Sequence, residues 1–187
     1  LLAFFCYIEG VNTVIFFAGN YASTTIGFSD IELLIFFTTV QTTAILGAVI
    51  FGIVSDSIGQ KRTIVISLFL WLITIGLAFY SKDKASFYVV GLLAGSVMGA
   101  TQSTSRSLMS KLTPDDRKTE FFGFYSFFGK SSAIIGPLVF GLVSYFSGSQ
   151  RWAILSIAFF FIIGLLVLTK VEDPIVSEPV SGDAIHR

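Results

Sequence analysis

Residues 63–80 read TIVISLFLWLITIGLAFY, a stretch without a charged side chain between Arg62 and Lys82. At about 1.5 Å of rise per residue, a helix of this length crosses most of the ~30 Å hydrocarbon core of a bilayer. The rest of the chain has the same character, because 53% of its 187 residues are hydrophobic and only 13% are charged. Soluble domains carry roughly 25% charged residues. The composition therefore indicates a membrane protein and excludes a cytosolic enzyme and a disordered chain. Twelve basic residues balance twelve acidic ones, which excludes a nucleic-acid binder.

Five further stretches are long and apolar enough to span a membrane. The expected transmembrane helices cover residues 1–21, 31–54, 63–80, 87–109, 121–145 and 152–169. The predicted fold class is all-α, a multi-pass transmembrane bundle of six helices occupying residues 1–171. Residues 172–187 are polar, contain Pro174 and Pro179, and are expected to form a disordered cytoplasmic tail. Because Leu1 already lies in an apolar run and is not a Met, we expect an N-terminal part to precede it.

Basic residues are distributed unevenly between the two ends of the expected helices. Three lie at one end (Lys82, Lys84 and Arg151), and eight lie at the other: Lys61, Arg62, Arg106, Lys111, Arg117, Lys118, Lys170 and Arg187. Cytoplasmic loops carry the excess of Lys and Arg, so we expect both ends of the chain in the cytoplasm. We favour a bacterial inner membrane over a eukaryotic vacuole.

Few side chains suit metal binding or covalent catalysis. The single His is His186 and the single Cys is Cys6, so a His/Cys metal cluster and an internal disulfide are both excluded. The chain has no P-loop and no dinucleotide-binding glycine motif. We therefore expect no metal, no cofactor and no enzymatic activity, with a membrane enzyme that uses only acidic side chains as an alternative.

Four of the expected helices carry polar side chains at helical spacing. These are Glu9, Asn12 and Thr13; Thr38, Gln41 and Thr42; Gln102, Ser103 and Arg106; and Ser126 with Lys130. The helices at 63–80 and 152–169 are apolar all round, which predicts a 3+3 repeat with the third helix of each triplet at the periphery. The Thr38–Gln41–Thr42 face suits interhelical hydrogen bonds as well as a cavity. Gly91, Gly95 and Gly99 predict close helix packing, and Gly136–Pro137 predicts a kink that could act as a hinge.

Glu9 and Lys130 are charges expected near the middle of the membrane. Glu9 lies about 12 Å along its helix from Leu1, and Lys130 about 15 Å from Glu120. A charge at this depth costs about 2.5–3.5 kcal/mol, so both residues are functional candidates. A structural Glu9–Lys130 ion pair is one interpretation, and substrate or proton handling is the other. We favour the second interpretation, because Asn12 and Thr13 share a face with Glu9.

The connection between the second and third helices reads GIVSDSIGQKR, from Gly52 to Arg62. It resembles the G-x-x-x-D-x-x-G-x-[RK]-[RK] loop of the major facilitator superfamily. Gly52 would let a neighbouring helix approach, and Gly59 would permit a tight turn. Asp56 could accept hydrogen bonds from Lys61 or Arg62, or face a helix N-terminus, where an anion is favoured.

Further segments are similar to the vacuole-effluxer branch of that superfamily. They are residues 7–13 (YIEGVNT), 99–107 (GATQSTSRS), 120–126 (EFFGFYS), 129–130 and 136–137. The resemblance covers about residues 2–171, although family members often have Asp at the position of Glu9. Chains of that family have twelve helices in two halves, and the family includes fungal vacuolar amino-acid exporters. The resemblance therefore implies a C-terminal half whose partner is a missing N-terminal six-helix half.

The resemblance also implies secondary active transport of a small solute by alternating access, with amino acids as candidate substrates and a proton or ion as candidate coupling partner. The candidate cavity residues are Glu9, Asn12, Thr13, Gln41, Gln102 and Lys130. The candidate cytoplasmic gate comprises Gly52, Asp56, Gly59, Lys61, Arg62 and Arg106, and the packing or hinge positions are Gly91, Gly95, Gly99, Gly136 and Pro137. The alternatives are a non-transporting membrane scaffold or receptor, and a homodimeric half-transporter.

Overall fold

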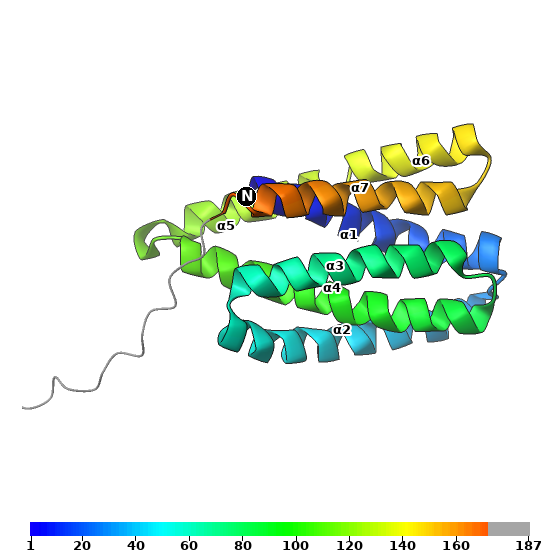
Figure 1. The fold of residues 1–187 in the computed structure, drawn as a ribbon, viewed down its shortest axis with the longest axis horizontal. Coiled ribbons are helices and arrows are strands. Elements are labelled where there is room, and N and C mark those ends of the chain that lie inside the picture. The colour runs from blue at the N-terminus through cyan, green and yellow to red at the C-terminus, as the bar shows by residue number, and fades with distance from the viewer. Residues whose placement is uncertain (172–187) are drawn as a thin grey trace, which may run out of the picture.

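The computed structural model describes residues 1–171, which form helices and no strand. The elements are α1 (Leu2–Tyr21), the π-helical turn η1 (Ala22–Ile26), α2 (Asp30–Ile58), α3 (Gln60–Tyr80), α4 (Lys84–Leu112), the 3-10 turn η2 (Asp115–Arg117), α5 (Lys118–Ser131), α6 (Ile135–Ser147) and α7 (Gln150–Leu168). The helices run along the long axis of the molecule, with the connections at its two ends (Figure 1). Within this range, six segments are long and apolar enough to cross a membrane. The chain is therefore an all-α, multi-pass membrane bundle, as predicted, while the tail predicted over 172–187 lies outside the described residues.

Local sequence signals set several helix ends. Ser29 and Glu32 form a capping box at the start of α2, in which the Ser29 N–H donates to the Glu32 carboxylate at 2.8 Å. Asp83 caps α4 by accepting from the Ser86 N–H at 2.9 Å, and the hydrogen bonds from Ser86 hold the pKa of Asp83 below its usual value. Gly59 separates α2 from α3 with φ of 93°, a conformation that side chains with a Cβ rarely adopt.

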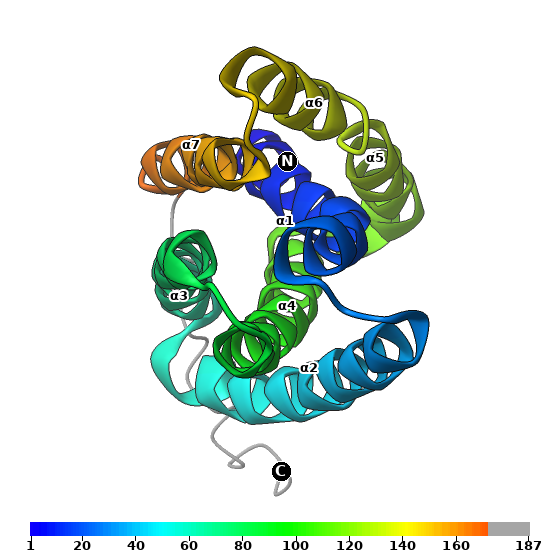
Figure 2. The same cartoon turned by 90° about the vertical axis from the view of Figure 1, so that its right-hand side faces the viewer.

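The two helix triplets exchange their first helices. α1 packs against α5, α6 and α7, whereas α4 packs against α2 and α3. The view along the bundle shows these two groups, with α3 and α7 in contact between them (Figure 2). Each group thus combines one helix from one triplet with the second and third helices of the other.

α4 lies unusually close to α2, and the glycine stripe of α4 makes this possible. A Cβ on Gly91 would overlap the Phe36 ring, a Cβ on Gly95 would overlap the Val40 carbonyl oxygen, and a Cβ on Gly99 would overlap the Ala44 carbonyl oxygen. From the other side, a Cβ on Gly47 of α2 would overlap the backbone of Ser96. Small residues at these positions let the two backbones meet.

α3 has an inward face that its all-apolar sequence conceals. Trp71 is 1% exposed, stacks on Phe161 of α7 with 5.2 Å between ring centroids, and donates from Nε1 to Thr101 Oγ1 of α4 at 3.1 Å. α7 also buries one side, which includes Ala153, Ile157 and Phe161. We expected the helices at 63–80 and 152–169 to have no side turned away from lipid, and this prediction is wrong for both α3 and α7. The least buried spans are Asp30–Ile58 and Asp115–Ser147, with 11% and 17% of an apolar 18-residue stretch buried, against 44% for Gln60–Tyr80.

The single helix predicted over 121–145 is interrupted. α5 ends at Ser131 and α6 begins at Ile135, so residues 132–134 form a break. Pro137 explains the interruption, because it lacks an N–H and its ring would clash with the carbonyl four residues earlier in a continuous helix. In the first turn of a new helix neither problem arises, which is where the structure places Pro137.

Candidate functional site

A cavity of about 870 Å³ lies between α1, α2, α3, α4, α6 and α7. Its wall is mostly apolar and includes Val14, Phe17, Phe37, Trp71, Met98 and Phe140. Many ligand pockets combine an apolar wall of this kind with a few polar groups that orient the ligand. Besides Tyr21, whose hydroxyl donates to the Ala78 carbonyl, the polar side chains lining the cavity are Gln41, Thr74, Gln102, Ser103 and Arg106.

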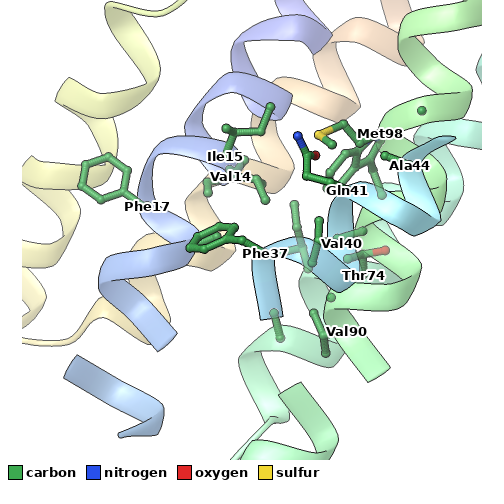
Figure 3. A pocket seen from close by; sticks show the side chains of 18 of the residues that line it. Val14, Ile15, Phe17, Phe37, Val40, Gln41, Ala44, Thr74, Val90 and Met98 are labelled. Carbon is green, nitrogen blue, oxygen red and sulfur yellow. The ribbon is translucent and has the colours of Figure 1, made fainter. Parts of the chain in front are cut away.

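The polar side chains enter the cavity from α2, α3 and α4. Gln41 extends from α2 between Ile15 of α1 and Met98 of α4 (Figure 3). Gln102 and Arg106 lie on α4 four residues apart, so their side chains lie on the same face of that helix. Arg106, which the sequence suggested as a gate residue, is therefore part of the cavity wall, and it supplies a positive charge there.

Glu9 does not line this cavity. Its side chain is 1% exposed, and Oε1 accepts a hydrogen bond from the backbone N–H of Gly136 in the first turn of α6. Neither Ile134 nor another residue of the break supplies a side-chain cap to α6. The Glu9 carboxylate therefore takes the place of a helix cap, at the end of the helix where the backbone dipoles favour negative charge.

Asn12 and Thr13 also turn toward the break rather than the cavity. Asn12 Nδ2 donates to the Gly129 carbonyl at 3.2 Å and to Ser132 Oγ at 2.9 Å. The Thr13 hydroxyl donates to the Glu9 carbonyl at 2.8 Å, and a Cβ on Gly136 would overlap that hydroxyl. The polar face of α1 thus holds the C-terminal end of α5 and the N-terminal end of α6.

Lys130 lies apart from Glu9. Its side chain is exposed on α5, it does not line the cavity, and no salt bridge joins it to Glu9 among residues 1–171. The ion-pair interpretation is therefore wrong for this conformation, because Lys130 is exposed whereas the buried Glu9 carboxylate meets α6. The Thr38–Gln41–Thr42 face was expected to form interhelical hydrogen bonds or to line a cavity. The Thr38 and Thr42 hydroxyls instead donate to carbonyls one turn back in α2, and of the three residues Gln41 is the one that lines the cavity.

The charged side chains of the loop motif around Gly59 do not pair with one another. Asp56 and Arg62 are exposed, and Lys61 Nζ donates to the Val171 carbonyl. Within residues 1–171, Asp56 forms no salt bridge with Lys61 or Arg62. A Cβ on Gly52 would lie 3.9 Å from Ser103 Oγ, an ordinary contact, so the glycine that admits a close helix on α2 is Gly47 instead.

Sequence reasoning missed two polar contacts. Tyr7 is 2% exposed and shares a 2.7 Å hydrogen bond with Ser105 Oγ, which ties α1 to α4. Ser132 lies in the break, is fully buried, and bridges Asn12 and the Gly129 carbonyl. The sequence does contain a signal for the Ser132 contact. Ser132 follows Gly129 and precedes Gly136–Pro137, and small and polar residues around a proline often accompany an interrupted helix.

The sequence of the chain matches a known family over nearly its whole length. The profile of the family described as "Vacuole effluxer Atg22 like" matches residues 1–174. An uncharacterized MFS-type transporter of Bacillus subtilis, YxiO, is 31% identical over 173 residues, covering 92% of this chain and 40% of that protein.

Fungal proteins are similar as well. Autophagy-related protein 22 of Kluyveromyces lactis is 28% identical over 178 residues, covering 89% of this chain and 36% of that protein. The protein of the same name from Candida glabrata is 29% identical over 179 residues, covering 90% of this chain and 32% of that protein. The chain thus spans about a third to two fifths of the length of these relatives.

Proposed function

Because the chain belongs to the vacuole effluxer Atg22-like family, we propose that it is part of a secondary active transporter that moves a small solute across a membrane by alternating access. The observation that carries this proposal is the cavity of about 870 Å³, enclosed by apolar helices of a membrane bundle and lined by Gln41, Gln102 and Arg106. The Bacillus subtilis relative described as an MFS-type transporter supports the same class of activity.

The cavity lining favours a solute with an apolar part and a group that Arg106 can bind. Arg pairs well with carboxylates, and the amides of Gln41 and Gln102 can both donate and accept hydrogen bonds. An amino acid carries a carboxylate, an ammonium group and a side chain, and its ammonium group could be bound by the amide oxygens. We therefore keep amino acids as the candidate substrates, on the basis of Arg106 and the two glutamines instead of Glu9 and Lys130.

We propose that further helices cover α2 and the α5–α6 segment. Both spans are apolar yet little buried within this chain, since only 11% and 17% of an apolar 18-residue stretch in each is buried. The face of α2 exposes Ile31, Leu34, Ile45, Val49 and Ile53. A missing six-helix half that packs against these two spans would lie beside the α2 side chains that line the cavity.

Asp56, Gly59, Lys61 and Arg62 are proposed to form a gate at the cytoplasmic end. Exposed Asp56 has a charge available to a group outside this chain, and the excess of Lys and Arg at this end supports a cytoplasmic location for it. A gate of this type would stabilise one of the two access states, since a charge can shift an equilibrium only where it interacts differently with the two states.

Uptake by the intact protein in proteoliposomes, measured with a mixture of radiolabelled amino acids, tests the proposal. Ala94 lines the cavity, so Ala94→Trp should obstruct it and lower uptake by about tenfold, the change that about 1.4 kcal/mol produces. Ala85→Trp introduces the same ring at an exposed position at the start of α4, away from the cavity, and should transport like the wild type. Equal uptake by the two variants would remove the cavity from the pathway, and no uptake by any form would favour a scaffold or receptor.

A further inference from the structure

The break between α5 and α6 is held from outside by a neighbouring helix. Residues 132–134 separate the two helices, and α6 has no side-chain cap of its own. Instead, α1 places Asn12 at the end of α5 and Glu9 at the start of α6. An amide donor at a helix C-terminus and a carboxylate at a helix N-terminus both match the backbone dipoles they face. We call these four partners, Glu9, Asn12, Gly129 and Gly136, the α1 clamp.

The clamp leaves one polar atom without a partner. Glu9 Oε1 accepts from the Gly136 N–H, whereas Oε2 is buried and has no hydrogen-bond partner among residues 1–171. A buried carboxylate oxygen in this situation is costly, and a proton relieves the cost by removing the charge. Thr13, which could approach Glu9 from one turn away, donates its hydroxyl to the Glu9 carbonyl instead.

Other charged groups do not reach Glu9. Besides Glu9, the titratable side chains of α1 and the helices packed around it are Cys6, Tyr7 and Tyr21 of α1, Lys84, Tyr88, Arg106 and Lys111 of α4, Lys118, Glu120, Tyr125 and Lys130 of α5, Tyr145 of α6 and Arg151 of α7. Tyr7 bonds Ser105 and Arg151 bonds the Phe79 carbonyl, while Lys130 and Tyr145 are exposed. Within residues 1–171 the carboxylate therefore interacts with backbone dipoles and not with a basic side chain.

We propose that Glu9 takes up a proton from water at Oε2 and releases it again, and that this proton controls the position of α6 relative to α5. Binding forms one O–H bond on the carboxylate and makes the group neutral. A neutral carboxyl accepts a weaker hydrogen bond from Gly136 and no longer balances the dipole of α6. Protonation therefore loosens the α6 end of the clamp, while Asn12 continues to hold α5.

The position of α6 matters to the cavity. Phe140, one turn after Gly136, lines the cavity and stacks on Phe17 of α1 with 3.9 Å between ring centroids. A movement of α6 would carry Phe140 with it and reshape the cavity wall. In this way the inference deepens the proposed function and rests on it for its consequence, because a proton at Glu9 would couple to the solute at the cavity.

The distance between α5 and α6 as a function of pH tests the proposal. Spin labels on Phe124→Cys of α5 and Tyr145→Cys of α6, both exposed positions, would report this distance by pulsed electron paramagnetic resonance in the intact protein with its native cysteines replaced. Wild-type protein should show two distance populations whose ratio changes with pH, by up to about tenfold per pH unit for a single proton. Glu9→Gln, which mimics the protonated carboxyl, should hold the low-pH population at every pH.

Matched controls keep the result specific to Glu9. Glu120→Gln makes the same change at an exposed position on α5 and should titrate like the wild type. If Glu9→Gln does not fold, Glu9→Asp keeps a titratable group with a shorter reach and should favour the low-pH population more than the wild type at equal pH. A wild-type distance that does not change with pH, or that responds to sodium in place of choline at fixed pH, would overturn the proposal. So would a Glu9→Gln protein that still titrates.

These measurements can refute the α1 clamp and the proposed transport independently of each other. The distance measurement needs no substrate, so a titrating distance in a protein without solute flux would support the clamp and count against transport. Solute flux with a distance independent of pH would support transport and overturn the clamp.

Discussion

Gly99→Ala should lower the stability of the folded protein, even though Ala is the better helix former. In a helix interior, Ala is favoured over Gly by about 0.8–1.0 kcal/mol. At Gly99, however, the added Cβ would overlap the Ala44 carbonyl oxygen and lie 2.9 Å from the Ala48 nitrogen. Both are backbone atoms of α2, so only a separation of α2 from α4 can relieve the overlap. Overpacking of this kind costs about 1–3 kcal/mol, and we expect the upper part of that range.

Gly76→Ala is the matched control for this prediction. It makes the same change in α3, where no heavy atom lies within 4 Å of the added Cβ, so the helix propensity gain should appear in full. The propensity term cancels between the two variants, and their difference of about 1–3 kcal/mol isolates the packing of α2 on α4. For a domain of 150–250 residues, this corresponds to a difference of about 2–12 °C in Tm.

Thermal unfolding in detergent, followed by circular dichroism, measures the difference. Gly99→Ala should melt below Gly76→Ala, and Gly76→Ala should melt at or above the wild type. If Gly99→Ala melts as high as Gly76→Ala, the close approach of α4 to α2 is not a feature of the folded protein.

Three further results are expected. Asp56→Asn removes the charge of the proposed gate and should insert into the membrane like the wild type but transport poorly; unchanged uptake would leave this loop without a gating role. Lys130→Met should not restore what Glu9→Gln loses, because the two side chains do not pair; recovery of expression and activity in the double variant would restore the ion-pair interpretation. A Cys at Ser110 should react with an impermeant thiol reagent only from the cytoplasmic side, and a Cys at Lys82 only from the other side; reaction of both from one side would contradict the membrane topology.

The break in the fifth span shows how far local sequence reasoning reaches. Gly136–Pro137 predicted a kink, because the missing N–H and the clash of the Pro137 ring are properties of that residue wherever it occurs in a helix. The sequence did not reveal that the kink would be a full interruption over 132–134. Whether a helix bends or stops depends on what satisfies the freed backbone groups, and here that is Asn12 and Glu9 from a distant part of the chain.

The prediction of the cavity residues was incomplete for a similar reason. Gln41 and Gln102 line the cavity, whereas Glu9, Asn12, Thr13 and Lys130 do not. Helical spacing identified which side chains share a face of one helix. It contained no information on which helix that face would meet, and the polar face of α1 meets the α5–α6 break instead of the cavity.

Local sequence patterns were enough to predict that this protein lies in a membrane, which segments span it and which helix faces are polar. Hydrophobic length, helical periodicity and turn residues such as Gly59 act within a few residues of one another, so each can be read from one segment. Three features became visible only in the folded chain: α1 and α4 exchange between the triplets, Glu9 caps α6, and Lys130 is exposed. These outcomes depend on how six helices rotate and pack against one another, and the side chains of α1 gain their partners only when residues more than a hundred positions away come into contact.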